Sequence, residues 1–297
     1  MMNIIDYLRT SKKLKLLPEQ EYALSIIYGL PTSDQNNIEL RSEYSELPVF
    51  EGDEEEYRKH LRTGKFWNGV HSRSALLAAG RGGGKTLLQV MVMRYEIENV
   101  VGADFGKDML LADGESLCVE YVSNSKEATA SALTLLVSVL KDSLPFIKGS
   151  YKVTKGKNPS VLFTRSSDGR DFLNVHFTTL GTTTGRSSSN GYLLMADYGK
   201  TTKEEAEKHL AYVWPAQAQF HGARVLLSSD MRDTTSWFHK TVLREVGNGE
   251  STWCTLNLPA WWLNGGIPGY FLENRREEDS EVFSWSYRGN VETVHST

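Results

Sequence analysis

The sequence predicts an α/β protein in which helices flank a mainly parallel β-sheet. Two observations carry this prediction. From residue 74 onward, short apolar runs alternate with segments of helical periodicity, which is the order expected when helices connect successive strands of one sheet. The runs are rich in β-branched and apolar residues, as strands that are buried on both faces require.

Five apolar runs are the expected strands, and they cover residues 74–79, 116–122, 172–180, 192–197 and 224–229. The run at 160–165 should form an antiparallel hairpin with the third of them, because Asp168 and Gly169 supply turn chemistry. Helices are expected at 85–99, 126–141, 203–212 and 237–245, and an aromatic strand-like segment covers 253–262.

The chain divides into three parts. Residues 1–72 form an N-terminal accessory segment of helical and loop-prone stretches, with helical periodicity from Leu14 to Ile27. Residues 73–260 form the core. Residues 261–297 form a charged tail that reads as a linker.

Composition excludes several classes of protein. No stretch approaches the roughly 20 apolar residues of a membrane-spanning helix, and the Met1 end has no leader pattern, so we expect a cytoplasmic protein without a membrane partner. A net charge of -4 argues against a uniformly basic nucleic-acid coat, although local basic loops can still hold DNA. Cys118 and Cys254 lie in apolar runs without metal-binding spacing and should be inert core residues.

The strongest motif is a glycine-rich loop between the first expected strand and the helix after it. The pattern GxxxxGK[ST] is matched, with alanine in place of the first glycine, by Ala79, Gly80, Arg81, Gly82, Gly83, Gly84, Lys85 and Thr86. In such a Walker A loop, glycines let backbone N–H groups and the start of the helix surround phosphates. The motif predicts a P-loop NTPase core of the ASCE/RecA-like type; the alternative is an incidental flexible turn.

Three residues of the loop have expected roles. Lys85 should contact the β- and γ-phosphate oxygens of ATP, and the Thr86 hydroxyl should ligate Mg²⁺. Arg81 would lie beside the γ-phosphate as a sensor or stabiliser of its charge, or else be a solvent-facing loop cation. The cofactors predicted by this motif are therefore ATP and Mg²⁺.

A second acidic position follows the fourth expected strand. Asp197 ends the run at 192–197, where a P-loop ATPase holds the carboxylate of its magnesium shell; the alternative is a turn or capping aspartate. Tyr198 stands where many ATPases place a glutamate that orients the attacking water. Asp197, Glu204 or Glu205 would then polarise the water, or the chain hydrolyses ATP slowly or depends on a partner.

Taken in order, these motifs resemble the ATPase part of terminase large subunits, the viral genome-packaging motors of tailed bacteriophages and herpesvirus-like systems. The resemblance covers most of the chain, and its segments are LLPEQEYALSIIYGLP, AGRGGGKT, SLCVEYVSNSKEATASALTLLVSVL, LGTTTGRSSSNGYLLMADYG and RVLLSSD. Only the Walker A match is specific alone, and it is specific to P-loop proteins in general. The others gain weight from their order.

The resemblance implies roles for further residues. Gln20 would lie near the adenine as part of a Q-like motif. Arg186 would be an arginine finger that reaches the γ-phosphate of a neighbouring subunit, or else an exposed loop arginine or a DNA contact. A coupling motif at the end of the fifth strand would comprise Ser228, Ser229 and Asp230, which are otherwise ordinary polar residues at a strand end.

The resemblance also implies an activity and partners. It implies a hydrolase that couples ATP turnover to translocation of double-stranded DNA into a procapsid, in the cytoplasm of an infected host cell. The portal protein, the terminase small subunit and a homo-oligomeric ring are the implied partners, with a monomer in isolation as an alternative. The DNA backbone would be gripped without sequence readout by loop cations such as Lys152, Lys155 and Lys157, which otherwise form a solvated basic loop.

Family members usually continue into a nuclease domain with an acidic metal-binding cluster. Nothing in this sequence resembles that domain, so nuclease activity is not expected of it. Two other functions remain open: a helicase-type or recombination-type P-loop ATPase, and a weakly hydrolysing nucleotide-binding regulatory subunit.

Overall fold

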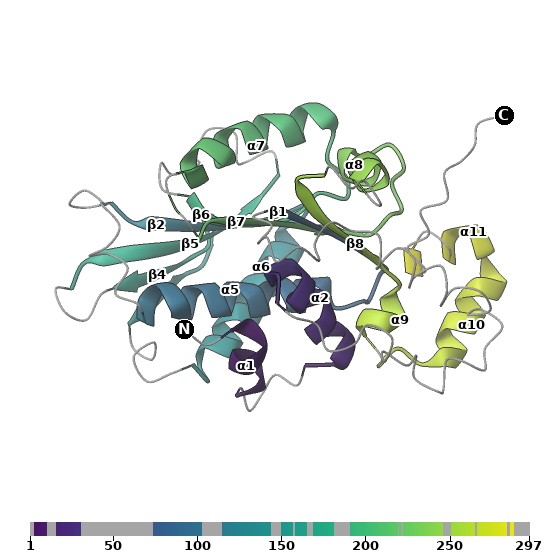
Figure 1. Ribbon diagram of the computed structural model, residues 1–297, viewed down its shortest axis with the longest axis horizontal. Helices are drawn as coiled ribbons and strands as arrows, with labels where there is room; N and C mark the ends of the chain where they lie inside the picture. Colours follow the sequence, from purple (N-terminus) through teal and green to yellow (C-terminus); the bar gives the residue numbers. More distant parts are fainter. Residues whose placement is uncertain are drawn as a thin grey trace. The chain divides into compact units, whose positions relative to one another are not determined.

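The computed structural model describes two compact units, each discontinuous in sequence (Figure 1). The first comprises Met1–Lys15 and Thr86–Leu227, and the second Leu16–Lys85 and Ser228–Thr297. The described residues are 3–10, 16–30, 74–102, 115–143, 150–156, 158–164, 169–180, 191–218, 220, 222–245, 251–264, 266–283 and 286–287. The boundary between the units crosses the glycine-rich loop between Lys85 and Thr86.

The first unit is built on strands in the order β3-β4-β5-β2-β6-β7. Their bounds are Leu117–Ser123 for β2, Tyr151–Thr154 for β3, Ser160–Thr164 for β4, Asp171–Thr179 for β5, Gly191–Asp197 for β6 and Arg224–Ser229 for β7. The central strand β2 runs parallel to β5 and β6, whereas β4 is antiparallel to both β3 and β5. The buried strands β2 and β6 are almost continuously apolar, as strands covered on both faces require.

Helices cover both faces of these strands. Their bounds are Ile4–Arg9 for α1, Lys85–Gly102 for α5, Lys126–Leu140 for α6 and Lys203–Ala218 for α7. α6 packs on β2 and β5, and α7 packs on β6. Figure 1 shows α7 on one face of the strands and α5 and α6 on the other.

In the second unit, β1 (Ser74–Ala79) pairs in parallel with β8 (Trp253–Leu258), in a register that joins Ser74 to Trp253 and Ala79 to Leu258. Among the described residues of this unit, the helices are α2 (Pro18–Tyr28), α8 (Trp237–Glu245), α9 (Ala260–Leu263), α10 (Gly269–Glu278) and α11 (Ser280–Phe283). α2 and α8 both contact β8, and α2 also contacts α9. Figure 1 shows α8 on the opposite side of β8 from α2 and α9.

The predicted fold class is confirmed, because the described residues form a mixed eight-stranded sheet flanked by helices. All five expected strands are present to within one residue at each end, as β1, β2, β5, β6 and β7. The expected hairpin is the antiparallel pair β4 and β5. Cys118 and Cys254 are buried and free, as expected, and burial raises the pKa of the Cys254 thiol to about 12.

Two segments differ from expectation. Lys152 belongs to strand β3, not to a basic loop, because pairing with β4 holds this short edge strand, and only four residues alternate there. The segment at 253–262 is not one strand: β8 ends at Leu258, and Pro259 caps the start of α9. The predicted boundaries of the three sequence parts stay predictions. Within the described ranges, no helix is long and apolar enough to cross a bilayer.

Candidate functional site

The glycine-rich loop has a backbone that only glycine adopts readily. Gly82 and Gly84 have φ values of 82° and 78°, in the left-handed region where side chains are disfavoured. Between them, the Gly83 amide donates a hydrogen bond to the Gly80 carbonyl at 3.1 Å and closes a tight turn. The loop is therefore a compact bend that leads from β1 into α5.

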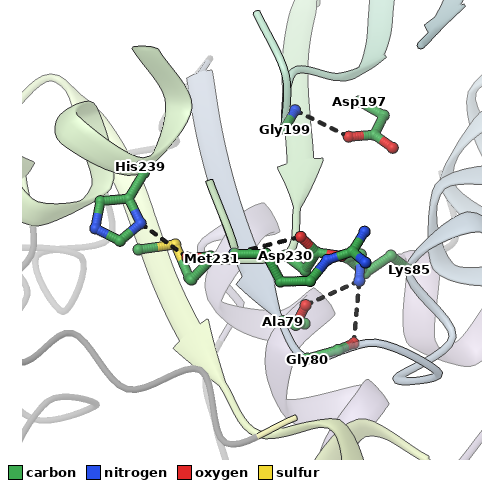
Figure 2. A network of polar contacts seen from close by, with 9 residues as sticks. Ala79, Gly80, Lys85, Asp197, Gly199, Asp230, Met231 and His239 are labelled. Atoms are coloured by element: carbon green, nitrogen blue, oxygen red, sulfur yellow. Dashed lines mark hydrogen bonds and ion pairs between the residues drawn. The ribbon is translucent and has the colours of Figure 1, made fainter. Parts of the chain in front are cut away.

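The Lys85 side chain folds back onto the start of this loop. Its Nζ donates hydrogen bonds to the carbonyl oxygens of Ala79 at 2.8 Å and Gly80 at 3.0 Å (Figure 2). The ammonium group thus lies against the bend at the point where the chain leaves β1. An anionic group that enters the bend would compete with these two neutral carbonyls for a full positive charge.

Gln20 lies beside the same loop, in the second unit. Its Oε1 accepts a hydrogen bond from the Leu17 amide at 3.2 Å, and its Nε2 donates to the Leu263 carbonyl at 2.9 Å. The Nε2 atom is 3.9 Å from the place where a Cβ on Gly84 would lie. The structure therefore brings Gln20 to the loop, and its contact with an adenine stays a prediction.

In the first unit, both predicted magnesium ligands influence the buried hydroxyl of Tyr121. Burial, followed by the negative charge of Asp197, raises the pKa of Tyr121 to about 12, and the Thr86 side chain opposes the shift. Thr86 and Asp197 are far apart in sequence, but both act on one phenol group.

The strand register places Tyr121 and Asp197 on one face of the sheet. Tyr121 on β2 is the partner of Met195 on β6 in a parallel ladder, so both side chains point to the same face of the sheet. Asp197 follows two residues later and returns to that face, because side chains alternate along a strand. Its Oδ1 accepts a hydrogen bond from the Gly199 amide at 3.1 Å (Figure 2).

Helix α5 is tied to the strands one turn after Thr86. The buried Gln89 side chain donates through Nε2 to the carbonyls of Ala196 and Leu226, each at 3.4 Å. One carbonyl lies directly before Asp197 on β6, and the other belongs to β7. These contacts fix the start of the helix over the ends of two strands.

The residues at this position fit a magnesium ion. A hydroxyl and a carboxylate are the hard oxygen ligands that Mg²⁺ prefers, and the ion commonly takes one or two carboxylates from the protein and the rest of its shell from phosphates and water. Thr86 and Asp197 supply one group of each kind. The contact of Gln89 with the Ala196 carbonyl places the first turns of α5, which carry Thr86, beside the end of β6, which carries Asp197.

Tyr198 points away from these ligands. The side chain is fully buried, and its hydroxyl forms a hydrogen bond with Nδ1 of His209 on α7. His209 Nε2 in turn lies 3.4 Å from Glu120 Oε2, and Glu120 Oε1 accepts a hydrogen bond from Thr178 Oγ1 at 3.3 Å. Burial and the charge of Glu120 raise the pKa of Tyr198, so this residue is a neutral part of the packing under α7.

The two glutamates proposed as replacements for the missing acid differ in their surroundings. Glu205 Oε2 accepts hydrogen bonds from the Thr202 amide at 3.1 Å and from Thr202 Oγ1 at 2.9 Å. The Glu205 amide donates back to that hydroxyl at 3.2 Å, which makes a capping box at the start of α7. Glu204 is exposed. Glu205 therefore has a structural task, and which group polarises the water stays a prediction.

The end of β7 and the turn after it, residues 228–231, belong to the second unit and make several polar contacts. Ser228 and Ser229 are buried, and Asp230 forms an ion pair with Arg232 at 3.0 Å. The Met231 carbonyl accepts a hydrogen bond from His239 Nδ1 at 3.0 Å (Figure 2). Burial lowers the pKa of His239. The coupling role of this corner stays a prediction.

The remaining predicted residues are distributed as follows. Arg81 is exposed, and its backbone amide donates a hydrogen bond to the Ser286 carbonyl. Lys152 and Lys155 are exposed. Arg186 and Lys157 lie outside the described residues.

Sequence reasoning missed Tyr121 and Gln89, because neither belongs to a motif. The available signal was strand alternation. Tyr121 lies two residues before the end of β2. Its hydroxyl comes near Asp197 at the end of β6 only because β2 and β6 are neighbours in the sheet. Strand order was the missing information.

Comparison with known proteins gives a likeness in structure only. No family model matches the sequence, and no curated protein matches it. The ATPase domain of the Thermus phage P74-26 large terminase superposes with a TM-score of 0.53 at 10% identity, over 75% of this chain and 90% of that one. A mutant of the same domain gives 0.53 at 9% identity, over 74% and 90%.

The large terminase of bacteriophage HK97 superposes with a TM-score of 0.60 at 11% identity. The match covers 97% of this chain but 54% of the HK97 chain, so this chain spans about half of that protein. At such low identities the likeness shows the fold alone. This chain has the α/β fold of a P-loop NTPase, the same fold as the ATPase domain of phage large terminases.

Proposed function

We propose that this chain is an ATP-hydrolysing motor domain that drives double-stranded DNA into a viral procapsid. The position of Asp197 beside the first turns of α5 is the observation that supports it best, because Gln89 on that helix donates to the carbonyl of Ala196, directly before Asp197, at 3.4 Å. An incidental glycine-rich turn would not need an acidic strand end beside the residue that follows its lysine. A magnesium-nucleotide site needs that arrangement.

Each residue has a task in this proposal. The bend from Ala79 to Gly84 surrounds the phosphates with backbone N–H groups, and Lys85 exchanges its carbonyl partners for phosphate oxygens. Thr86 and Asp197 would be the protein ligands of Mg²⁺. A bound magnesium ion supplies neutralisation of the charge on the phosphate oxygens. Gln20 lies beside Gly84 and reads the base.

The proposal includes slow hydrolysis in the isolated chain. Tyr198 is bonded to His209 and has no carboxylate, and Glu205 caps a helix, so Asp197 or Glu204 remains to orient the water. Arg186 from a neighbouring subunit would supply positive charge to the γ-phosphate in an assembled ring. Turnover then rises when the ring forms.

The likeness of fold to phage terminase ATPase domains supports DNA packaging as the task of the motor. The terminase small subunit and the portal protein are the proposed partners, and the host cytoplasm is the proposed place of action. The exposed Lys152 and Lys155 would contact the duplex backbone, and the corner at Ser228 and Ser229 would pass hydrolysis to the moving parts.

Substitution of Lys85 tests the nucleotide site. Titration calorimetry of wild-type protein with ATP and Mg²⁺ should show uptake, and Lys85→Ala should lose it because Lys85 is the cation that the motif directs at the β- and γ-phosphate oxygens. Lys126→Ala is the matched control, since Lys126 is exposed and begins α6 after β2 as Lys85 begins α5 after β1. Equal affinity of the Lys85→Ala and wild-type proteins would exclude the proposed site.

The DNA-dependence of turnover separates the candidate tasks. The packaging proposal expects that duplex DNA, with the packaging partners present, stimulates ATP hydrolysis. Stimulation by single strands and not by duplex would support a helicase-type ATPase instead. Binding of ATP without turnover under every condition would support a regulatory subunit.

A further inference from the structure

We propose that Asn264 is a positioning residue of the glycine-rich bend, whose side-chain amide holds the peptide group between Gly82 and Gly83 in the orientation that admits phosphate. This inference rests on the proposed nucleotide function and adds a residue to it. Asn264 directly follows α9, far from the Walker A motif in sequence, and it belongs to the same compact unit as the bend.

One peptide group of the bend is held at both ends. The Gly82 carbonyl accepts a hydrogen bond from Asn264 Nδ2 at 2.8 Å. The Gly83 amide donates to the Gly80 carbonyl at 3.1 Å. In a trans peptide the C=O and N–H bonds point in opposite directions, so the two hydrogen bonds together fix the plane of this group. The Gly82 carbonyl is thereby directed out of the turn, toward Asn264.

This peptide group needs a restraint because both of its residues are glycines. Without a Cβ on either side, rotation of the group meets few steric barriers. Rotation would turn the negative end of the Gly82 carbonyl dipole into the bend, where phosphates require backbone N–H groups instead. A donor on the outer side of the bend keeps that negative end away from the phosphates.

Asn264 is itself firmly placed. The carbonyl before it, on Leu263, accepts a hydrogen bond from Gln20 Nε2 at 2.9 Å. The Asn264 amide donates to the Ala260 carbonyl at 2.9 Å, so the peptide group between Leu263 and Asn264 is held on both sides. Asn264 Oδ1 accepts from the Gly266 amide at 3.1 Å. This bond orients the side-chain amide, with Nδ2 facing the bend.

The start of α9 also lies close against the bend. A Cβ on Gly83 would lie 3.3 Å from the Cα of Ala260, and a Cβ on Gly80 would lie 2.8 Å from the Cβ of Ala260. Glycine at these two positions therefore leaves room for the first residue of α9. Asn264 follows one turn later and reaches Gly82, so the contact belongs to a packed surface.

The test compares the affinities for ATP and ADP. Gly82 directly follows Arg81, which is expected beside the γ-phosphate, so a misdirected Gly82 carbonyl should weaken ATP more than ADP. Calorimetric titrations in excess Mg²⁺ give both affinities for wild type and for Asn264→Ser. The ratio of ATP affinity to ADP affinity is then taken within each protein.

Serine at 264 separates the two contacts of the side chain. Its hydroxyl can still accept from the Gly266 amide in a local turn, but the shorter side chain does not reach Gly82. We expect Asn264→Ser to lower the ratio by about three- to tenfold, the effect of one hydrogen bond. A purely structural role of Asn264 would weaken both nucleotides equally and leave the ratio unchanged.

Asn274→Ser is the matched control. Asn274 is exposed on α10 of the same unit, and its substitution should leave the ratio at the wild-type value. Asn264→Asp is a second variant, which keeps the shape of the side chain but replaces the donor by an acceptor. It should lower the ratio at least as far as Asn264→Ser, because a carboxylate repels the Gly82 carbonyl. Urea unfolding checks that each variant is folded.

The outcomes separate the two proposals. A wild-type ratio in folded Asn264→Ser and Asn264→Asp would overturn the role of Asn264 while the nucleotide site stands. Absence of ATP uptake by folded wild-type protein would overturn the proposed function and this inference with it.

Discussion

Asp197 and Tyr198 are neighbours in sequence, but they belong to opposite faces of the sheet. Asp197 lies on the α5 face with Thr86 and Tyr121, where oxygen ligands gather. Tyr198 lies on the α7 face, in a buried network with His209 and Glu120. Two consecutive side chains therefore have different environments: Asp197 faces the candidate metal site, and Tyr198 is part of the buried packing under α7.

The difference shows why motif position alone does not assign a catalytic acid. A glutamate after the Walker B aspartate is useful only if its carboxylate can reach the attacking water, and the side chain at 198 extends beneath α7. His176 adds a further group to the α7 face, because it is the partner of Glu120 in the ladder between β2 and β5. Substitutions on the two faces of the sheet test this contrast.

On the α5 face, Asp197→Asn should lower ATP turnover by about 100-fold or more, because an amide cannot supply the negative charge that holds the metal shell. The amide oxygen can still accept the Gly199 amide proton, so the free energy of unfolding should change little. Steady-state hydrolysis assays and urea unfolding measure the two quantities. A variant with wild-type turnover would remove Asp197 from the site.

On the α7 face, Tyr198→Glu should not raise turnover and should destabilise the fold by about 3–5 kcal/mol, because it buries a second negative charge near that of Glu120. Tyr198→Phe is the control and should cost about 1 kcal/mol through loss of one hydrogen bond, with affinity for magnesium-ATP unchanged. Urea unfolding and turnover per folded molecule are the measurements. Faster turnover in Tyr198→Glu would show that position 198 reaches the nucleotide after all.

The smallest effect concerns pH. Burial holds the pKa of His176 below its usual 6.5, against an opposing effect of the Glu120 charge. The unfolded chain therefore takes up a proton before the folded protein does, so this stabilisation is complete above about pH 6.5 and is lost as pH falls toward the folded pKa. Urea midpoints at neutral and mildly acidic pH should differ less in His176→Gln than in wild type, and an equal difference would contradict this account. The pKa of His239 is also lowered, so part of the pH dependence of stability should persist in the wild type and in His176→Gln alike.

The local pattern of apolar residues in the sequence was enough to predict most of the strands. The strands β1, β2, β5, β6 and β7 have apolar runs that a strand buried on both faces requires, and their bounds were predicted closely. The edge strand β3 was missed because its four residues carry little pattern and depend on pairing with β4. The helix α10 was missed because charged residues fill its second half, and α11 was missed because its four residues are too short to carry a helical pattern.

The sequence by itself determined the glycine-rich bend, its lysine and threonine, and the aspartate at the end of β6, because backbone freedom, charge and metal chemistry restrict which residues can stand there. The tertiary structure alone decided that Tyr121 and Asp197 share a face of the sheet, that Gln89 ties α5 to β6 and β7, and that Tyr198 turns to His209. Strand order and register set these contacts, and both arise from pairing between residues that are distant along the chain.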